Sequence, residues 1–266
     1  MTIAVRLELR RTRALVLWLV VITVAYGATM AVFWPVMRDN AALIQQYMDV
    51  FPKGFLAAFG MEGSLADPGV FFTTYIGSWL WPILAALAGV LLATRPVAVD
   101  LERGFLELPL GTPLSRPAYL GASILAQSLA LAVLAIATVL GFYVAATLAG
   151  APYELDRMVL VALLCWAFAA AVAGVTSILA VVTLSRAIAG GVVVAALIAM
   201  YLLDVISRMQ PDLDLLGRLS AMHYLRFTPV IDDGVLPLGE LALFLLVGLL
   251  GWGLSVWAFR RRDLAA

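Results

Sequence analysis

The sequence has few of the side chains that carry most enzyme chemistry. It contains one cysteine, Cys165, which excludes a disulfide or a thiolate metal site within one chain, so we expect this residue to serve packing. It contains one histidine, His223, which excludes a paired-histidine metal site of the H-E-x-x-H type. No serine lies in a G-x-S-x-G setting, so the nucleophile elbow of a hydrolase is absent. These absences argue against an enzyme, and we expect His223 to be an ordinary interfacial residue.

Lysine is equally scarce, and this bears on nucleotide binding. A Walker A loop, G-x-x-x-x-G-K-[ST], needs a lysine whose ammonium reaches the phosphates. The single lysine, Lys53, is followed by Gly54 and Phe55 and has no glycine-rich turn before it. We therefore expect no ATP and no other cofactor to bind to this chain.

Charged residues of either sign are also few in this sequence. Charged residues make up 13% of the chain and hydrophobic residues 64%, whereas soluble domains average roughly 25% and 45–50%. The sequence predicts an all-α integral membrane protein with one transmembrane domain, 1–266. Each apolar stretch is long enough for a helix to cross about 30 Å of hydrocarbon. The predicted spans are 14–37, 70–94, 118–149, 158–184, 187–206 and 239–259.

The fourth and fifth spans are separated by very little. Arg186 divides two apolar arms that together are too long for one crossing, which predicts a tight hairpin at Ser185 and Arg186.

The first span follows a basic segment, as the apolar core of a signal peptide would. Such a core is about 7 to 15 residues long, but the apolar stretch here has 24 residues, 14–37, and no obvious small-residue cleavage site. We predict an uncleaved anchor.

The basic residues predict the orientation. With the N-terminus inside, the inner segments hold eleven of the seventeen basic residues, which satisfies the positive-inside rule. Both termini are then cytoplasmic, and the formal net charge of zero hides a polarity across the membrane. Nothing in this pattern indicates nucleic-acid binding. The inner set is Arg6, Arg10, Arg11, Arg13, Arg95, Arg103, Arg116, Arg186, Arg260, Arg261 and Arg262.

The predicted spans lack the ionisable residues that an ion relay needs. A charge at the membrane centre costs at least about 2.5–3.5 kcal/mol and is kept mainly for function. Asp204 and Glu240 fall at the outer ends of the fifth and sixth spans, where water can reach them. Gln127 is the strongest polar group at depth, and we expect it to form a hydrogen bond between helices. A proton or sodium relay is not expected, so any energy for transport enters elsewhere.

Two outer loops remain. In 38–69, Ile44, Tyr47, Met48 and Phe51 fall at helical spacing, which predicts an amphipathic helix on the outer surface. It is either a lid or a structural cap, and the cap is the favoured interpretation. The loop 207–240 is interrupted by prolines and predicts short interfacial helices.

The only sizeable inner loop is 95–117. Leu101, Phe105 and Leu108 recur at helical spacing beside charged residues, which predicts a short amphipathic helix between spans two and three. Pro109 and Gly111 end it early. From the residues alone, a helix that receives a push from a cytoplasmic partner and a simple re-entry turn are equally good interpretations.

A family resemblance favours the first interpretation. The loop resembles the signature E-x-G-[ST]-L-E-x-L-L-[ST]-x-P-[VI]-S-R of bacterial ABC transporter permeases of the second exporter type, although Pro109 and Gly111 stand where the family more often has leucines. The basic entry to the first span and the closing segment Phe259, Arg260, Arg261, Arg262, Asp263 and Leu264 are also similar to that family. The matching loop residues are Glu102, Gly104, Phe105, Leu106, Glu107, Pro113, Leu114, Ser115, Arg116 and Pro117.

The resemblance implies a permease subunit of an ATP-driven exporter in the bacterial cytoplasmic membrane. It implies a coupling helix in this loop, an interfacial helix at the N-terminus, and a separate cytoplasmic ATPase that binds ATP and magnesium. A complete pathway across the lipid membrane then needs a second copy of this chain or a homologous permease. The residues it points to for ATPase coupling are Glu102, Arg103, Gly104, Phe105, Glu107 and Arg116. The alternatives are a membrane scaffold that binds a cytoplasmic partner without transport and a membrane enzyme that depends on His223. The substrate stays open among amphiphiles, peptides, lipids and drugs.

Overall fold

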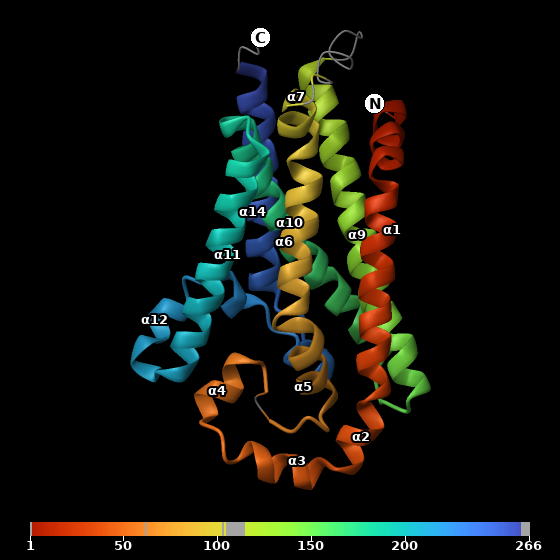
Figure 1. The fold of residues 1–266 in the computed structure, drawn as a ribbon, viewed down its shortest axis with the longest axis vertical. Coiled ribbons are helices and arrows are strands. Elements are labelled where there is room, and N and C mark those ends of the chain that lie inside the picture. The colour runs from red at the N-terminus through yellow and green to blue at the C-terminus, as the bar shows by residue number, and fades with distance from the viewer. Residues whose placement is uncertain (1, 62, 103, 105–114, 262–266) are drawn as a thin grey trace.

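The fold is a bundle of long helices (Figure 1). The structure is a computed structural model that describes residues 2–61, 63–102, 104 and 115–261, and its secondary structure over these residues is entirely helical. Within this part of the chain, six helical segments are long and apolar enough to cross a membrane, in agreement with the six predicted spans. They are Ile3–Asp39, Pro68–Glu102, Arg116–Leu148, Leu155–Thr183, Arg186–Met209 and Leu238–Arg261.

The first segment starts with one uninterrupted helix, α1 (Thr2–Val32), followed by α2 (Trp34–Asp39). The residues expected to form an interfacial helix at the N-terminus are helical and continue without a break into the first span. The reason is local, because no glycine or proline occurs between Thr2 and Tyr26 to end a helix. Ile3 and Leu7 leave their side chains exposed on this helix.

The second segment is assembled from pieces. It consists of α5 (Pro68–Phe72), a π-helical turn (Thr73–Gly77), α6 (Leu80–Ala93), a second π-helical turn (Arg95–Val99) and α7 (Asp100–Glu102). The predicted span ended at residue 94, whereas the helix continues to Glu102. The predicted loop 95–117 is therefore helical where it begins. The extension is stable because the side chains of Pro96, Val97, Ala98 and Val99 are buried.

The other spans are simple helices. They are α9 (Arg116–Leu148), α10 (Leu155–Thr183), α11 (Arg186–Met209) and α14 (Leu238–Arg261). The predicted hairpin between the fourth and fifth spans is confirmed, since only Leu184 and Ser185 lie between α10 and α11. Leu184 takes a left-handed conformation with φ of 53°, and Ser185 caps α11.

Helix α10 lies at the centre of the bundle. It packs against α14, α6, α9 and α11. Its contact with α14 is very close, because a Cβ atom added to Gly174 would lie 2.5 Å from the carbonyl oxygen of Gly248 and one added to Gly251 would overlap the backbone of Gly174. Small residues let the two backbones approach, which is the usual basis of helix association in membranes.

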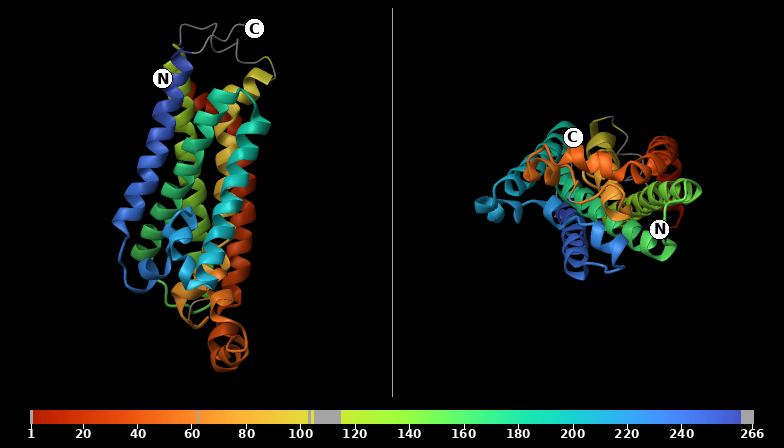
Figure 2. Two further views of the ribbon diagram at one scale, coloured as in Figure 1. Left: turned by 90° about the vertical axis from the view of Figure 1, so that its left-hand side faces the viewer. Right: turned by 90° about the horizontal axis from the view of Figure 1, so that it is seen from below.

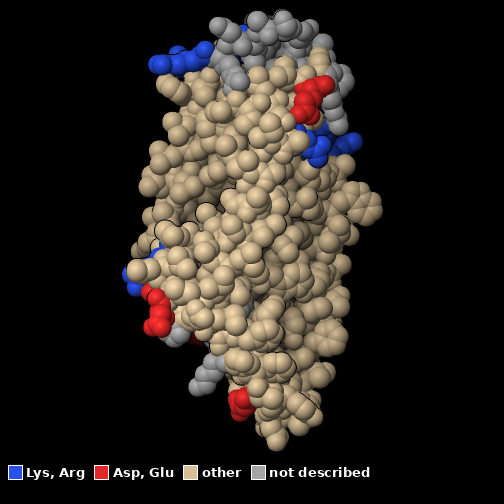
Figure 3. All heavy atoms as spheres, turned by 60° about the vertical axis from the view of Figure 1, so that its left-hand side comes forward, with Lys and Arg blue, Asp and Glu red and all other residues tan. Residues whose placement is uncertain are grey.

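Charged side chains gather at the two ends of the bundle, and the face drawn in Figure 3 has an uncharged band between them. Helix α1 begins and α14 ends at the same end, where α7 also lies (Figure 1). We call this the terminal end. The opposite end, the loop end, holds the connections between spans one and two and between spans five and six (Figures 1 and 2).

The loop end contains the short helices that the sequence predicts. The first connection forms α3 (Ala41–Met48) and α4 (Lys53–Ala58), and Met48 packs against Leu65 and Val70. The second connection forms a 3-10 turn (Pro211–Leu213), α12 (Asp214–Gly217), a further 3-10 turn (Ala221–Tyr224) and α13 (Thr228–Asp232). These elements cover one end of the bundle.

Replacing Gly251 by alanine should destabilise the bundle, because the added methyl group has no room between α14 and α10 and overpacking costs about 1–3 kcal/mol. Thermal unfolding in detergent measures the effect as a lower midpoint. Gly253 is the matched control on the same helix, since a Cβ there meets nothing within 4 Å. Equal midpoints for the two variants would contradict the proposed role of the close helix contact.

Candidate functional site

The start of the predicted coupling loop is held in place by a buried ion pair. Arg11 of α1 donates from Nη1 to Asp100 Oδ2 at 2.9 Å and from Nη2 to Oδ1 at 2.7 Å. Asp100 is 2% exposed. A carboxylate this deeply buried needs a partner, and a bidentate guanidinium is the best geometric match for it. The pair joins two parts of the chain that are 89 residues apart in sequence.

Two further groups complete this cluster. Arg11 Nη1 also donates to Glu8 Oε1 at 2.9 Å, one turn earlier on α1. The Tyr119 hydroxyl lies 3.0 Å from the Pro96 carbonyl oxygen and 3.1 Å from Asp100 Oδ2, so its one proton is shared between two acceptors. The inner anchor, as we call Glu8, Arg11, Asp100 and Tyr119, therefore connects α1, α7 and α9.

A second bond ties the same short segment to a different helix. Glu102 Oε1 accepts a hydrogen bond from the backbone N–H of Arg186 at 2.9 Å. Arg186 is the first residue of α11, and an N–H in the first turn of a helix has no partner inside that helix. A carboxylate is favoured there because it satisfies the donor and complements the helix dipole. Helix α7 thus lies between the inner anchor on one side and the start of α11 on the other.

Helix α11 is packed more loosely than its neighbour α10. Only 22% of its most apolar window is buried, against 72% for α10. A helix with few buried contacts can shift at a lower cost in packing than a central one. The bond from Glu102 therefore reaches a span with few buried residues.

The structure describes three of the six predicted coupling residues. Glu102 is exposed and bonded to α11. Gly104 has φ of 68°, a left-handed conformation that favours glycine, and a Cβ there would meet nothing. Arg116 begins α9 and is half-buried. Arg103, Phe105 and Glu107 lie outside the described residues, so their role stays a prediction.

Sequence reasoning missed the inner anchor. It treated Arg11 as one of four equivalent basic residues that set the orientation, and it did not single out Asp100 or Tyr119. A signal was present, since Asp100 is an acidic residue directly after the apolar run 96–99. What the sequence could not supply is the partner on α1, because that pairing depends on how α1, α7 and α9 pack.

At the loop end, two expectations about polar residues are corrected. Asp204 was expected to be open to water, but it is 5% exposed, because α11 continues to Met209 and the second connection covers it. Its Oδ2 accepts from Arg208 Nε at 2.9 Å, and its Oδ1 lies 4.0 Å from His223 Nδ1. Burial and the nearby Arg226 lower the pKa of His223, so this histidine is neutral at pH 7.

Gln127 also differs from expectation. It is buried, but neither atom of its amide group has a hydrogen-bond partner in the described part of the structure, so the predicted bond between helices is not formed. Cys165, by contrast, is completely buried among apolar residues, as the packing role predicts. Among the described residues, no cluster of three or more histidine, cysteine, aspartate or glutamate side chains is arranged to hold a metal ion.

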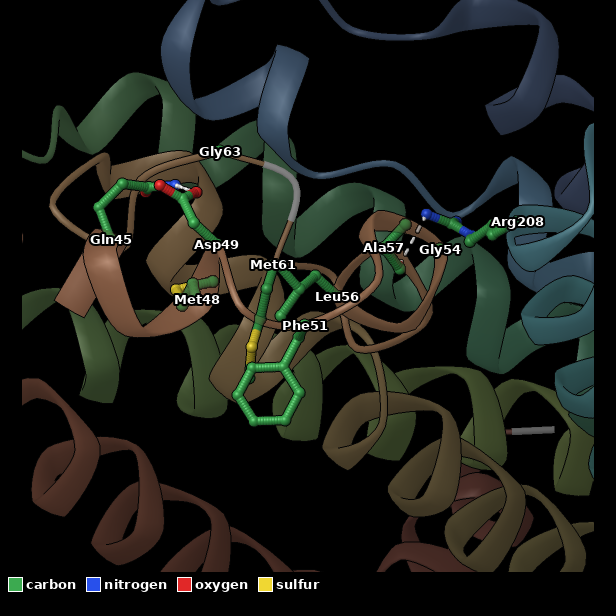
Figure 4. Close-up of a pocket in the computed structure, with 10 residues that line it drawn as sticks. All are labelled: Gln45, Met48, Asp49, Phe51, Gly54, Leu56, Ala57, Met61, Gly63 and Arg208. Carbon is green, nitrogen blue, oxygen red and sulfur yellow. Dashed lines mark hydrogen bonds between the residues drawn. The ribbon is translucent and has the colours of Figure 1, made fainter.

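Arg208 also borders a pocket of about 420 Å³ between α11 and the first connection (Figure 4). Its Nη1 lies 3.4 Å from the Ala57 carbonyl oxygen of α4, while Gln45 and Asp49 lie across the pocket and bond to each other at 3.0 Å. The arrangement joins α4 to α11 and supports the interpretation of the first connection as a cap.

The inner anchor makes a stability prediction. Replacing Arg11 by glutamine should leave the Asp100 carboxylate buried with a weaker partner, and breaking a buried pair costs about 3–5 kcal/mol. Arg13, two residues away and exposed, is the matched control for loss of one positive charge. Thermal unfolding in detergent should show a large fall in midpoint for R11Q and little change for R13Q. Equal effects would mean that only the net charge of the segment matters.

The loop end makes a pH prediction. Burial and the adjacent carboxylate of Asp67 raise the pKa of Asp232 to about 6, because the two acids share a hydrogen bond and cannot both ionise cheaply. The folded state therefore binds an extra proton between the ordinary pKa of 3.8 and about 6, and this contribution to stability is lost as the pH rises through that window. Replacing Asp232 by asparagine should raise the unfolding midpoint at pH 7 and flatten its dependence on pH between 4 and 7. Replacing the exposed Asp212 of the same connection by asparagine should leave that dependence in place.

A family model described as "ABC-2 family transporter protein" matches residues 4–264. A search of curated proteins finds no match. The family match covers nearly the whole chain, including all six apolar segments and the candidate site. The resemblance read from the loop signature is thus confirmed, and the chain belongs to the ABC-2 family of membrane transporter proteins.

Proposed function

We propose that this chain is the permease subunit of an ATP-driven exporter in the bacterial cytoplasmic membrane, and that a separate ATPase supplies the energy. The family supports a transporter component, and the sequence has no lysine placed for a Walker A loop. The observation that carries the proposal is the double attachment of α7, to the inner anchor and to α11. A segment held in this way can turn a push from outside the bundle into a movement of one span.

The ATPase contact in this proposal is formed by the residues that follow α7. Arg103, Phe105 and Glu107 are the proposed contact residues, Gly104 provides the left-handed turn, and Arg116 begins the return into α9. Glu102 has a different part from the one first expected. Because its carboxylate is bonded to α11, it acts inside the permease and passes the movement on.

Alternating access then follows from the different packing of the helices. Closure of the ATPase on ATP pushes the loop, the inner anchor holds α7 against α1 and α9, and the bond at Glu102 tilts α11. Two copies, or one copy and a homologous permease, enclose the pathway. ATP biases the equilibrium because its binding energy differs between the two conformations.

The scaffold alternative shares the loop but not the movement. A scaffold needs a partner held on the loop, whereas an exporter also needs a span that responds. The bond between Glu102 and the first residue of the loosely packed α11 favours the exporter.

The partner is tested by purification in mild detergent. A tagged chain should bring down an ATPase subunit of the kind that carries a Walker A loop, identified by mass spectrometry. Replacing Glu107 by alanine should release it, while R13A, which also changes one charge near the terminal end, should retain it. The proposal would be contradicted if folded wild-type protein repeatedly purified without an ATPase subunit.

The bond between Glu102 and α11 is tested with a proline. Replacing Arg186 by proline removes the N–H that Glu102 accepts, and proline is tolerated at the first position of a helix. The control is R186A, which keeps the N–H and loses the same charge. We expect R186P and E102A to hydrolyse ATP with the partner but to transport poorly, while R186A transports normally. Transport by R186P equal to that of R186A would show that the bond does not transmit the movement.

A further inference from the structure

An apolar groove of about 480 Å³ runs along one side of the bundle. Helix α10 forms its floor, and α11 and α14, which both pack against α10, form its walls. The lining residues on these helices are all hydrophobic. They are Phe168, Ala171, Val172, Val175, Leu179, Val192, Val193, Ala196, Leu197, Met200, Leu243, Phe244 and Val247.

The length of the groove suits one acyl chain. On α10 it extends from Phe168 to Leu179, which is roughly 16 Å at about 1.5 Å per residue. This is about half of the roughly 30 Å hydrocarbon core. On α10 the groove runs from the middle of the helix toward Thr183, and the second connection closes its other end.

The groove is open to the surrounding hydrocarbon along its side. Three lining side chains keep a large exposed fraction, 38% for Val175, 50% for Val192 and 40% for Leu243. A lipid can therefore enter from the membrane without passing through the bundle.

The polar side chains that line the groove, Arg218, Ser220 and Tyr224, are all at its closed end. The segment from Arg218 to Tyr224 forms this end, and the Tyr224 hydroxyl donates to the Arg218 carbonyl oxygen at 2.9 Å. Ser220 Oγ accepts from the Met222 N–H at 3.1 Å. Among the described residues that line the groove, Arg218 alone is charged. A hydrophobic slot with one guanidinium at its end is complementary to an anionic amphiphile.

Arg218 can still receive such a ligand. Its Nε and Nη2 pair with Asp214 Oδ2 at 3.1 and 2.9 Å, but both side chains are exposed, and surface pairs contribute little. A guanidinium has five N–H groups, so it can bind a phosphate and keep part of this pair.

From this arrangement, we propose that the groove binds one acyl chain of an anionic phospholipid from the surrounding membrane, with the phosphate group at Arg218. The site is distinct from the coupling segment at the terminal end. The proposal concerns binding and does not depend on transport. Bound lipid would fill the space between α11 and α14 and so stabilise one position of the loosely packed α11.

The acyl chain is tested by filling the groove. Ala196 lines it and is exposed, so A196W should place an indole where the chain lies. Ala195 is exposed on the same helix and does not line the groove, which makes A195W the matched control. Native mass spectrometry of the purified protein, titrated with phosphatidylglycerol and with phosphatidylcholine of identical chains, should show at least about tenfold weaker binding of both lipids to A196W, equivalent to about 1.4 kcal/mol.

The headgroup is tested by reversing a charge. R218E should weaken phosphatidylglycerol binding about tenfold and leave phosphatidylcholine unchanged, since a charge-assisted hydrogen bond is lost. The control is R38E, another exposed arginine at the loop end beside an acidic residue. Because Arg218 is exposed, this variant should fold even if A196W does not.

Each other outcome would overturn the proposal. Unchanged lipid binding by A196W would show that the acyl chain does not occupy the groove. Equal effects of R218E and R38E would show that the phosphate does not bind at Arg218. If A196W alters the proportion of dimers in light scattering while lipid binding persists, a second copy of the protein occupies the groove instead. None of these results depends on an ATPase partner, so the exporter proposal stands or fails separately.

Discussion

The cost of burying charge in an apolar protein governs how this structure is organised. A buried carboxylate such as Asp100 is tolerated only when its charge is compensated, and Arg11 provides that compensation with two parallel hydrogen bonds. Because Arg11 belongs to α1 and Tyr119 to α9, satisfying one acid fixes three segments relative to one another. The same requirement places Arg208 beside Asp204 at the opposite end. Charge pairing therefore stabilises the two ends of the bundle, whereas close apolar contacts stabilise its middle.

The middle of the bundle is uneven, and this unevenness has functional meaning. Glycines let the backbones of α10 and α14 approach closely, so these two helices are tightly packed against each other. Helix α11 makes fewer buried contacts and leaves a groove on its side toward α14. In the proposed transport cycle α11 is the span that moves, because interfaces with little packing have alternative positions of similar energy.

The two proposals meet at α11. Its first residue is bonded to Glu102 at the terminal end, and its middle forms a wall of the lipid groove. Mechanical input and lipid would then act on the same helix from different places. Such coupling needs no direct contact between the sites, since both bias the position of one element.

The sequence alone was sufficient to predict the number of spans, the hairpin after Leu184 and the short helices at the loop end. Those features depend on local quantities, namely the length of apolar runs, the position of prolines and the capping by Ser185. Even the family could be read from the order of a few residues around Glu102 and Arg116, since that pattern is local in sequence. The helix of the second span continues past the predicted end at residue 94 to Glu102, because Val97 and its neighbours are buried.

Tertiary structure alone decided which polar groups meet. Arg11 and Asp100 are 89 residues apart and Glu102 and Arg186 are 84 apart, and neither pairing follows from periodicity or composition. Likewise, Asp204 was buried by a connection whose path the sequence did not reveal, and Gln127 was left without the partner expected for it. The physical reason is that the apolar length of a segment is a property of that segment, whereas the partner of a buried charge is a property of the packed bundle.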